Sequence, residues 1–192
     1  MENAPPSTTV PLHHPGKVEM ASYLAQGLIV SVAISVFLET LARNYVTTII
    51  PGDVGYVILV AGFAPIIEEF TKIFPLLNRH AETERSIMKL GFLSGLGFGL
   101  AEFLVYVIYF GAPIAVRLPE MFFHAANTSI VAYGVAKQKF PQFYAFAVFL
   151  HFANNFLTFF GDIWLLGGFV IMAVGYFLAW RYYYATSDSF LE

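Results

Sequence analysis

The sequence predicts an all-α membrane protein, a polytopic bundle of about six transmembrane helices. Its 192 residues are 58% hydrophobic and only 12% charged, whereas a soluble domain carries about 25% charged residues. The mean hydropathy is +0.67. Such a chain has too much apolar surface for water, and a lipid bilayer resolves that mismatch.

Six apolar stretches reach the roughly 20 residues that a helix needs to cross a bilayer. Short segments with turn and charge signals separate them, such as Pro51-Gly52-Asp53 and Gly111-Ala112-Pro113. Loops this short make neighbouring spans antiparallel. The predicted spans are 21–42, 54–77, 88–110, 113–136, 140–160 and 163–184.

The chain length suits one domain. We expect a flexible N-terminal tail over 1–20, a single transmembrane helical domain over 21–184 and a short C-terminal tail over 185–192. The first apolar stretch is too long for a secretory signal and lacks its charged start, so it is interpreted as a retained span.

The distribution of Lys and Arg predicts the orientation, because these residues are enriched in cytoplasmic loops. With the N-terminus inside, seven of them fall on the cytoplasmic side and two, Arg43 and Arg117, on the outer side. Both termini are therefore expected in the cytoplasm. Short loops and the absence of cysteine are compatible with a prokaryotic plasma membrane.

Composition also limits the partners. The net charge of −3 argues against a nucleic-acid partner, which usually needs a basic face. The chain has no cysteine, which excludes disulfides and thiolate chemistry.

Ionisable side chains inside the predicted spans are the clearest functional signal. Each costs about 2.5–3.5 kcal/mol at the centre of a span, so such residues usually face the bundle interior and mark function. They are Glu68, Glu69 and Lys72 in the second span, Glu102 in the third, His124 in the fourth and His151 in the fifth.

These groups are predicted to share one depth. Counted from the cytoplasmic ends of their spans, Glu68, Glu102, His124 and His151 lie nine to fourteen residues in. At about 1.5 Å per residue this places them within one or two turns of a common plane. Four antiparallel spans with a titratable group at similar depth indicate one polar site.

Local spacing refines this prediction. Glu68 and Glu69 are about 100° apart on a helix, so one can face the site while the other bonds to a neighbour. Small residues at 91, 95 and 99 allow a close helix contact, which would press Glu102 toward the adjacent span. A Glu beside Lys72 is a candidate general base.

Glu102, His124 and His151 form a second pattern, a set of two His and one Glu. These are the ligand types of a catalytic zinc site, which uses three protein ligands and a water molecule. Zinc is therefore a candidate cofactor, although no local motif joins ligands from three different spans.

Four stretches resemble motifs of the PrsW family of intramembrane proteases, which is distantly similar to the CAAX-prenyl-endopeptidase and bacteriocin-processing (CPBP) group. The resemblance runs from about residue 65 to 156. The family often has Asn directly after the third-span Glu, where this chain has Phe103. The matching stretches are Glu68-Glu69-Phe70-Thr71-Lys72, Gly97-Phe98-Gly99-Leu100-Ala101-Glu102, Arg117 leading to His124, and His151-Phe152-Ala153-Asn154-Asn155.

The resemblance implies hydrolysis of peptide bonds in a membrane protein or peptide, within or beside the bilayer. Glu68 would be the general base and Glu69 would support it. His124 and His151 would bind water or a metal, and Asn155 would stabilise the oxyanion, as side-chain amides do. Zinc on Glu102, His124 and His151 is favoured over a metal-free site in which Glu68 and His124 activate water.

Several alternatives stay open. Lys72 either snorkels to the cytoplasmic surface or pairs with Glu68. Glu39 and Arg117 are expected at the interface, and Glu120 is either a partner of His124 or lies among headgroups. The protein could also be a non-catalytic scaffold or an immunity-type binding protein. A proton-coupled carrier is least favoured, since internal repeats and broken helices are not evident.

Overall fold

The computed structural model describes residues 14–78 and 83–188. The first thirteen residues of the predicted N-terminal tail, the last four of the C-terminal tail and the predicted cytoplasmic Arg79 lie outside the described residues. The first helix begins at Lys17 and the last ends at Ala185.

The described residues form helices and no strand, which confirms the predicted all-α class. Consecutive helical segments continue into one another, and each such run is called a rod here. The first rod consists of α1 (Lys17–Ala25), η1 (Gln26–Ser31) and α2 (Val32–Ile49), and the second of α3 (Asp53–Val57), η2 (Ile58–Phe63), α4 (Ala64–Ile73) and η3 (Phe74–Leu76). The third consists of α5 (Glu84–Leu104) and η4 (Val105–Tyr109). The others are α6 (Ile114–Ala136), α7 (Phe140–Leu157) with η5 (Thr158–Phe160), and α8 (Asp162–Ala185).

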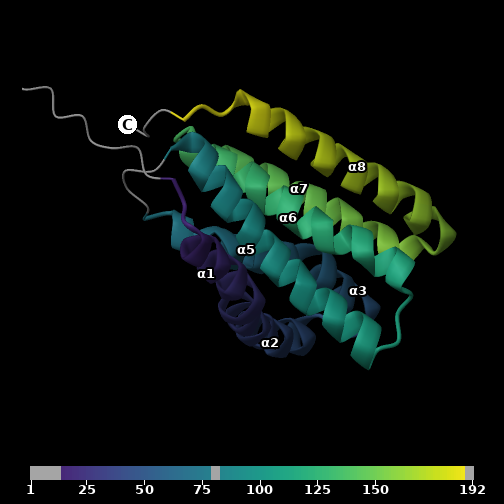
Figure 1. Cartoon of the computed structure of the whole chain (residues 1–192). Helices are drawn as coiled ribbons and strands as arrows, with labels where there is room; N and C mark the ends of the chain where they lie inside the picture. Colours follow the sequence, from purple (N-terminus) through teal and green to yellow (C-terminus); the bar gives the residue numbers. More distant parts are fainter. Residues whose placement is uncertain (1–13, 79–82, 189–192) are drawn as a thin grey trace, which may run out of the picture.

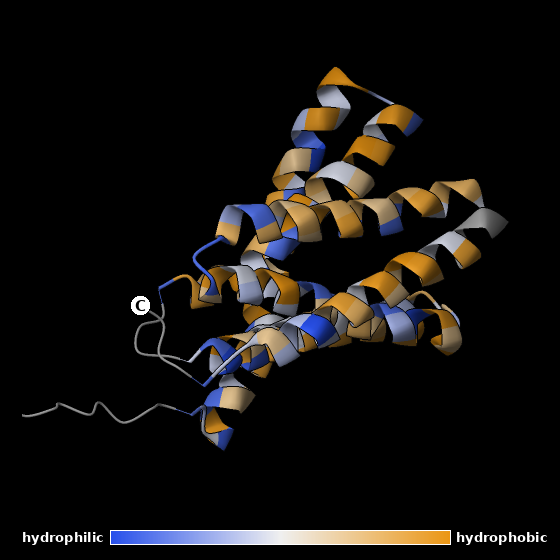
Figure 2. Cartoon of the chain, turned by 90° about the horizontal axis from the view of Figure 1, so that it is seen from above, coloured by the Kyte–Doolittle hydropathy of each residue, from blue (hydrophilic) through white to orange (hydrophobic). Residues whose placement is uncertain are grey.

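Three of these rods are long and apolar enough to cross a membrane: Lys17–Ile49, Glu84–Tyr109 and Phe140–Phe160. They support an integral membrane protein. Figure 2 shows apolar residues along most of the helices, with isolated hydrophilic residues among them. The remaining rods coincide with the other predicted spans, and their crossing of the bilayer stays a prediction.

Turns fall where the sequence predicted them. Gly52 and Gly111 have φ of 82° and 68°, a region that residues with a Cβ rarely adopt. The first rod extends to Ile49, beyond the predicted end at 42, because nothing in the intervening residues stops a helix.

Helix α5 lies at the centre of the bundle (Figure 1). It packs on α1 and η1 on one side and on α6 on the other, while α6 also contacts α7 and α8. The predicted small-residue stripe faces α6. A Cβ on Gly91 would lie 2.5 Å from Ala132 Cβ, and one on Gly99 would lie 2.5 Å from Met121 O. The two backbones can approach this closely only without those side chains.

Two apolar clusters hold the bundle together. One joins α4, α5 and α6 through residues such as Ile73, Leu90 and Val131, and the other joins α6, α7 and α8 around Phe123 and Leu150. Many other large apolar side chains stay exposed on the outer faces of the helices, as expected for surfaces that meet lipid rather than water.

The C-terminal end is tied to the start of α5. Arg85 donates to Asp188 Oδ2 at 2.9 Å and to the Thr186 carbonyl at 2.8 Å. Glu84 accepts from the Ser187 backbone N–H at 2.9 Å and pairs with Lys137. The C-terminal end, the start of α5 and the connection between α6 and α7 are thereby joined at one end of the bundle.

Candidate functional site

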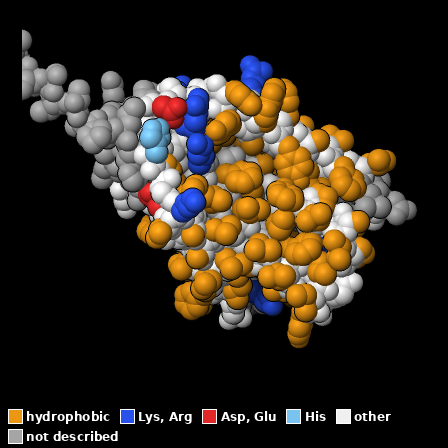
Figure 3. Space-filling view, viewed as in Figure 1, with side chains coloured by type: hydrophobic (Ala, Val, Ile, Leu, Met, Phe, Trp, Pro, Cys, Tyr) orange, Lys and Arg blue, Asp and Glu red, His pale blue; other side chains and the backbone are white. Residues whose placement is uncertain are grey.

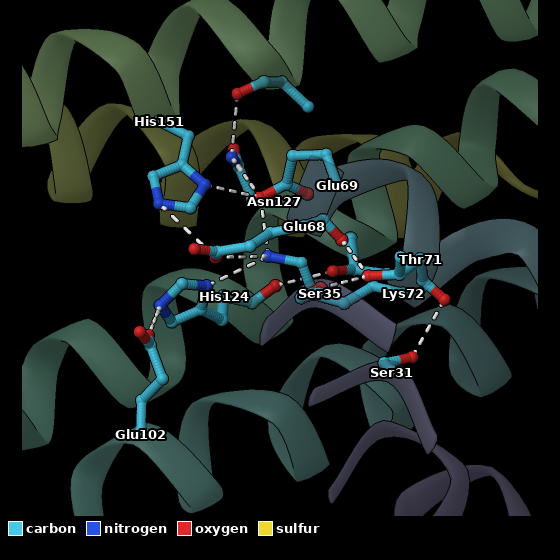
Figure 4. A network of polar contacts seen from close by, with 12 residues as sticks. Ser31, Ser35, Glu68, Glu69, Thr71, Lys72, Glu102, His124, Asn127 and His151 are labelled. Atoms are coloured by element: carbon cyan, nitrogen blue, oxygen red, sulfur yellow. Dashed lines mark hydrogen bonds and ion pairs between the residues drawn. The ribbon is translucent and has the colours of Figure 1, made fainter. Parts of the chain in front are cut away.

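The predicted polar residues meet in the interior of the bundle, on four helices (Figure 4). Glu68, Glu69 and Lys72 come from α4, and one residue each comes from α5, α6 and α7. The last three are Glu102, His124 and His151. The structure therefore brings these side chains together in one polar cluster, and their common depth in a membrane stays a prediction.

Lys72 lies at the centre of the cluster and is fully buried, with an exposed fraction of 0%. Its Nζ donates to Glu69 Oε1 at 2.7 Å and to His124 Nδ1 at 3.0 Å. Nζ also lies 4.6 Å from the centre of the Phe98 ring. Lys72 therefore does not snorkel, and the carboxylate closest to it is Glu69, since Glu68 Oε2 is 3.8 Å away.

Glu69 is the carboxylate that holds the cluster together. Its Oε1 accepts from Lys72, from His151 Nδ1 at 2.9 Å and from Asn127 Nδ2 at 3.4 Å. Asn127 also donates to the Ala147 carbonyl of α7 at 2.9 Å. The sequence reasoning missed Asn127, although a polar residue three positions after His124 in an apolar span is a usable signal.

Glu68 differs from its neighbour in having no such partners. It is buried, and Glu68 Oε2 has no hydrogen-bond partner among the described residues. The nearest polar groups are His151 Nε2 and Lys72 Nζ, both at 3.8 Å. The two adjacent glutamates thus differ: Glu69 bonds to its neighbours, and Glu68 Oε2 lies 3.8 Å from both His151 Nε2 and Lys72 Nζ without a hydrogen bond to either.

The partners of the two histidines define their tautomers. Since the Glu69 carboxylate accepts, His151 Nδ1 carries the proton, and the lone pair on His151 Nε2 faces Glu68. An ammonium group has only donors, so His124 Nδ1 accepts from Lys72, and its Nε2–H points to Glu102 Oε2 at 2.5 Å. His151 therefore has a free nitrogen, whereas both nitrogens of His124 are engaged.

The side chain of Glu102 is 32% exposed, and Tyr106, Arg117 and Glu120 lie around it together with His124. Arg117 pairs with Glu120 and lies 3.6 Å above the Tyr106 ring. Glu120 is thus a partner of Arg117 rather than of His124.

Glu39 also lies nearer the site than expected. This half-buried side chain of α2 is within electrostatic range of Glu102 and Lys72. Its position on the first rod, close to the predicted outer end of that span, gave no indication of this.

Asn155 is the one predicted site residue that stands outside the cluster. Its Nδ2 donates to the Val60 carbonyl in η2 at 3.0 Å, which ties α7 to the segment before α4. An amide committed to a backbone carbonyl is not aimed at the space beside Glu68.

A buried group of three residues can hold a metal ion. Glu68, His124 and His151 each offer one ligand atom, and these atoms lie within 4.8 Å of one another. The group differs from the predicted set in its carboxylate, Glu68 in place of Glu102. The physical reason is that Glu102 reaches only the outer nitrogen of His124, whereas Glu68 faces the free nitrogen of His151.

The donor chemistry of this group fits zinc, which binds imidazole nitrogen and carboxylate oxygen. Glu68 Oε2 and His151 Nε2 are ready to act as ligands, since neither is otherwise engaged in the described part of the chain. His124 would have to release either Lys72 or Glu102 to contribute a nitrogen.

Hydroxyl groups fix the helix that carries the two glutamates. Ser31 donates to the Thr71 carbonyl at 2.8 Å, and Ser35 shares a hydrogen bond of 2.7 Å with the Thr71 hydroxyl. Ser94 donates to the Lys72 carbonyl at 2.7 Å. These bonds join α4 to the first rod and to α5, so the cluster rests on helices that are held on two sides.

No protein-family model, curated protein or solved structure matches this chain. The resemblance of its motifs to the PrsW family therefore stays a prediction.

Proposed function

We propose that this protein is an intramembrane endopeptidase that hydrolyses peptide bonds of membrane-associated substrates. The observation that carries the proposal is the position of Glu68: its buried Oε2 has no hydrogen-bond partner in the described part of the chain, and it lies 3.8 Å from His151 Nε2, the ring nitrogen that does not bond to Glu69. An unpaired buried polar atom costs free energy, and a water molecule or metal ion bound to Glu68 Oε2 would remove that cost.

The geometry suits activation of water. At 3.8 Å, Glu68 Oε2 and His151 Nε2 are too far apart for a direct hydrogen bond but close enough for one water molecule, beside the line that joins them, to bond to both. Glu68 takes a proton from this water as the oxygen attacks the peptide carbonyl, and later gives it to the leaving amine. His151 accepts the second hydrogen bond and orients the water.

Lys72 is placed to stabilise the oxyanion. An ammonium group has three N–H donors, and hydrogen bonds to Glu69 and His124 use two of them. The third donor and the positive charge remain for a developing negative charge, in a site that excludes bulk water, where such stabilisation is strongest. This role replaces the one expected of Asn155.

Zinc would be held by Glu68, His124 and His151. When bound, it would supply a Lewis acid that polarises the carbonyl and lowers the pKa of its water. Glu68 would then be a ligand rather than the base.

Metal analysis of purified protein distinguishes a zinc-bound site from a metal-free site. With zinc we expect about one ion per chain, lost in Glu68→Gln and His151→Ala but kept in Glu102→Ala. Loss in Glu102→Ala with retention in Glu68→Gln would instead support the ligand set predicted from the sequence. An active preparation without metal would remove zinc from the proposal.

The peptidase proposal itself is tested in cells. Membrane-protein fragments are compared between cells that express the wild type, Glu68→Gln or the matched control Glu84→Gln, at equal protein levels. Glu84 lies at the end of the bundle in the pair with Lys137. Fragments that appear with the wild type and the control but not with Glu68→Gln are expected. Identical patterns in all three would favour a non-catalytic scaffold.

A further inference from the structure

A second feature of the bundle is an apolar groove that shares no residue with the cluster around Lys72. It lies between α1, α5, α6 and α8 and has a volume of about 560 Å³. Phe92 and Leu93 of α5, Phe122 of α6 and Trp180 of α8 form its walls. Figure 3 shows the face that these helices present, which is covered by hydrophobic side chains.

One positively charged residue lines this groove. Lys89 of α5 is exposed, and it has no hydrogen-bond or ion-pair partner among the described residues. Its neighbours differ in this respect, because Arg85 pairs with Asp188 and Lys137 pairs with Glu84. Lys89 is therefore a cation in an apolar groove without a counter-ion in the described chain.

The groove has a polar end and an apolar end. Lys89 lies in the second turn of α5, and Tyr183 and Tyr184 lie in the last turn of α8, so they meet where α5 begins and α8 ends. In Figure 3, Lys and Arg side chains gather at the edge of the hydrophobic face nearest the chain's C-terminus. Aromatic residues with a polar tip are typical of the headgroup level of a membrane.

This polarity matches the chemistry of one class of ligand. Basic pockets between transmembrane helices on the cytoplasmic side bind anionic lipid headgroups, and Lys89 places a positive charge at the polar end of this groove. We infer that the groove binds an acidic phospholipid, with the phosphate on Lys89 and the acyl chains along Phe92 and Phe122. The lipid supplies the missing counter-ion and covers the apolar walls.

The inference is tested on the full chain, purified in a neutral detergent and stripped of lipid. Phosphatidylglycerol and phosphatidylcholine are titrated in turn, with bound lipid measured by native mass spectrometry and the shift in melting temperature recorded. The variant is Lys89→Gln. The matched control is Lys139→Gln, which makes the same change of charge at an exposed residue that does not line the groove.

We expect phosphatidylglycerol to bind more tightly than phosphatidylcholine and to raise the melting temperature. Lys89→Gln should weaken phosphatidylglycerol binding roughly fivefold or more, which corresponds to about 1 kcal/mol per basic residue. Lys139→Gln should bind as the wild type does. Ala179→Trp, which fills the groove from α8, should lower the binding of both lipids.

Two results would overturn the inference. Equal binding of the two lipids by the wild type would show that charge plays no part, as would unchanged phosphatidylglycerol binding by Lys89→Gln. A dimer that binds neither lipid and is broken by Ala179→Trp would show that a second copy of the chain covers the groove instead. Ala179→Trp also tests the site on its own if Lys89→Gln does not fold.

Discussion

Replacement of Lys72 by Met should strongly destabilise the protein, because it leaves the Glu69 carboxylate buried without its cation. The Lys72 Nζ–Glu69 Oε1 distance of 2.7 Å corresponds to a Coulomb energy of about 6 kcal/mol at an effective dielectric constant of about 20. Two contributions reduce the net loss. The ammonium no longer has to be desolvated, and His151 and Asn127 still donate to Glu69.

Breaking a buried ion pair by removing one partner typically costs about 3–5 kcal/mol, and we expect Lys72→Met to fall in this range. Its unfolding free energy would be measured in detergent micelles by denaturant titration, beside Lys139→Met as an exposed control. The double variant Lys72→Met/Glu69→Gln should recover part of the loss, since neither charge then stays unpaired, with a coupling of about 1–3 kcal/mol.

A loss for Lys72→Met within about 0.5 kcal/mol of that for Lys139→Met, the usual range for surface substitutions, would refute this reasoning. Such a result would mean that the ammonium reaches water. Additive effects in the double variant would show instead that the two side chains do not interact.

Three further predictions concern the support of the site. Gly99→Ala should destabilise the bundle by about 1–3 kcal/mol through overpacking, since its Cβ would lie 2.5 Å from Met121 O. Gly62→Ala, with no atom within 4 Å of its Cβ, should instead stabilise the bundle by up to about 1 kcal/mol. Thermal unfolding of both variants checks the difference in sign. Asn155→Ala should lower the unfolding free energy by about 1 kcal/mol for its lost hydrogen bond and keep the rate of substrate cleavage within about tenfold of the wild type. Loss of an oxyanion donor lowers the rate about a hundredfold or more. A loss of that size in a cleavage assay would restore the predicted role of Asn155. Arg85→Ala should lower the unfolding free energy by about 1 kcal/mol, mostly through its lost hydrogen bond to the backbone, because its exposed ion pair contributes little. Limited proteolysis should then cut the C-terminal end faster. An unchanged rate would contradict the view that Arg85 holds this end on α5.

The positions of the helices could be predicted from hydropathy because each rod is an apolar stretch bounded by Gly, Pro or charge. That Glu68, Glu102, His124 and His151 would meet was also predictable, since the rise per residue of a helix gives each of them a similar distance from the end of its predicted span. What the sequence could not provide is the rotation of each helix about its axis. That rotation decides that Glu102 of α5 meets His124, whereas the two glutamates of α4 face His151.

Asn127 and Asn155 illustrate the same limit. Both are amides one turn from a histidine, and spacing alone favours neither. In the structure, Asn127 donates to Glu69 while Asn155 donates to the Val60 carbonyl. Val60 belongs to the π-helical segment η2, and apolar periodicity does not predict where a helix takes up that wider turn.

The candidate metal ligands were the hardest to assign from sequence. Glu102 and Glu68 have the same chemistry and similar depth, and only their geometry separates them. Glu102 bonds to His124 Nε2, whereas Glu68 has a free oxygen beside His151.

The central claim is that Glu68 activates water for peptide hydrolysis. The most direct measurement reconstitutes the purified wild type and Glu68→Gln into vesicles with membrane proteins from cells that lack this chain, in water labelled with a heavy oxygen isotope. Mass spectrometry then reads the new carboxyl termini. We predict fragments with the isotope at their new C-termini for the wild type and none for Glu68→Gln. Labelled fragments in equal amounts from both proteins would contradict the claim.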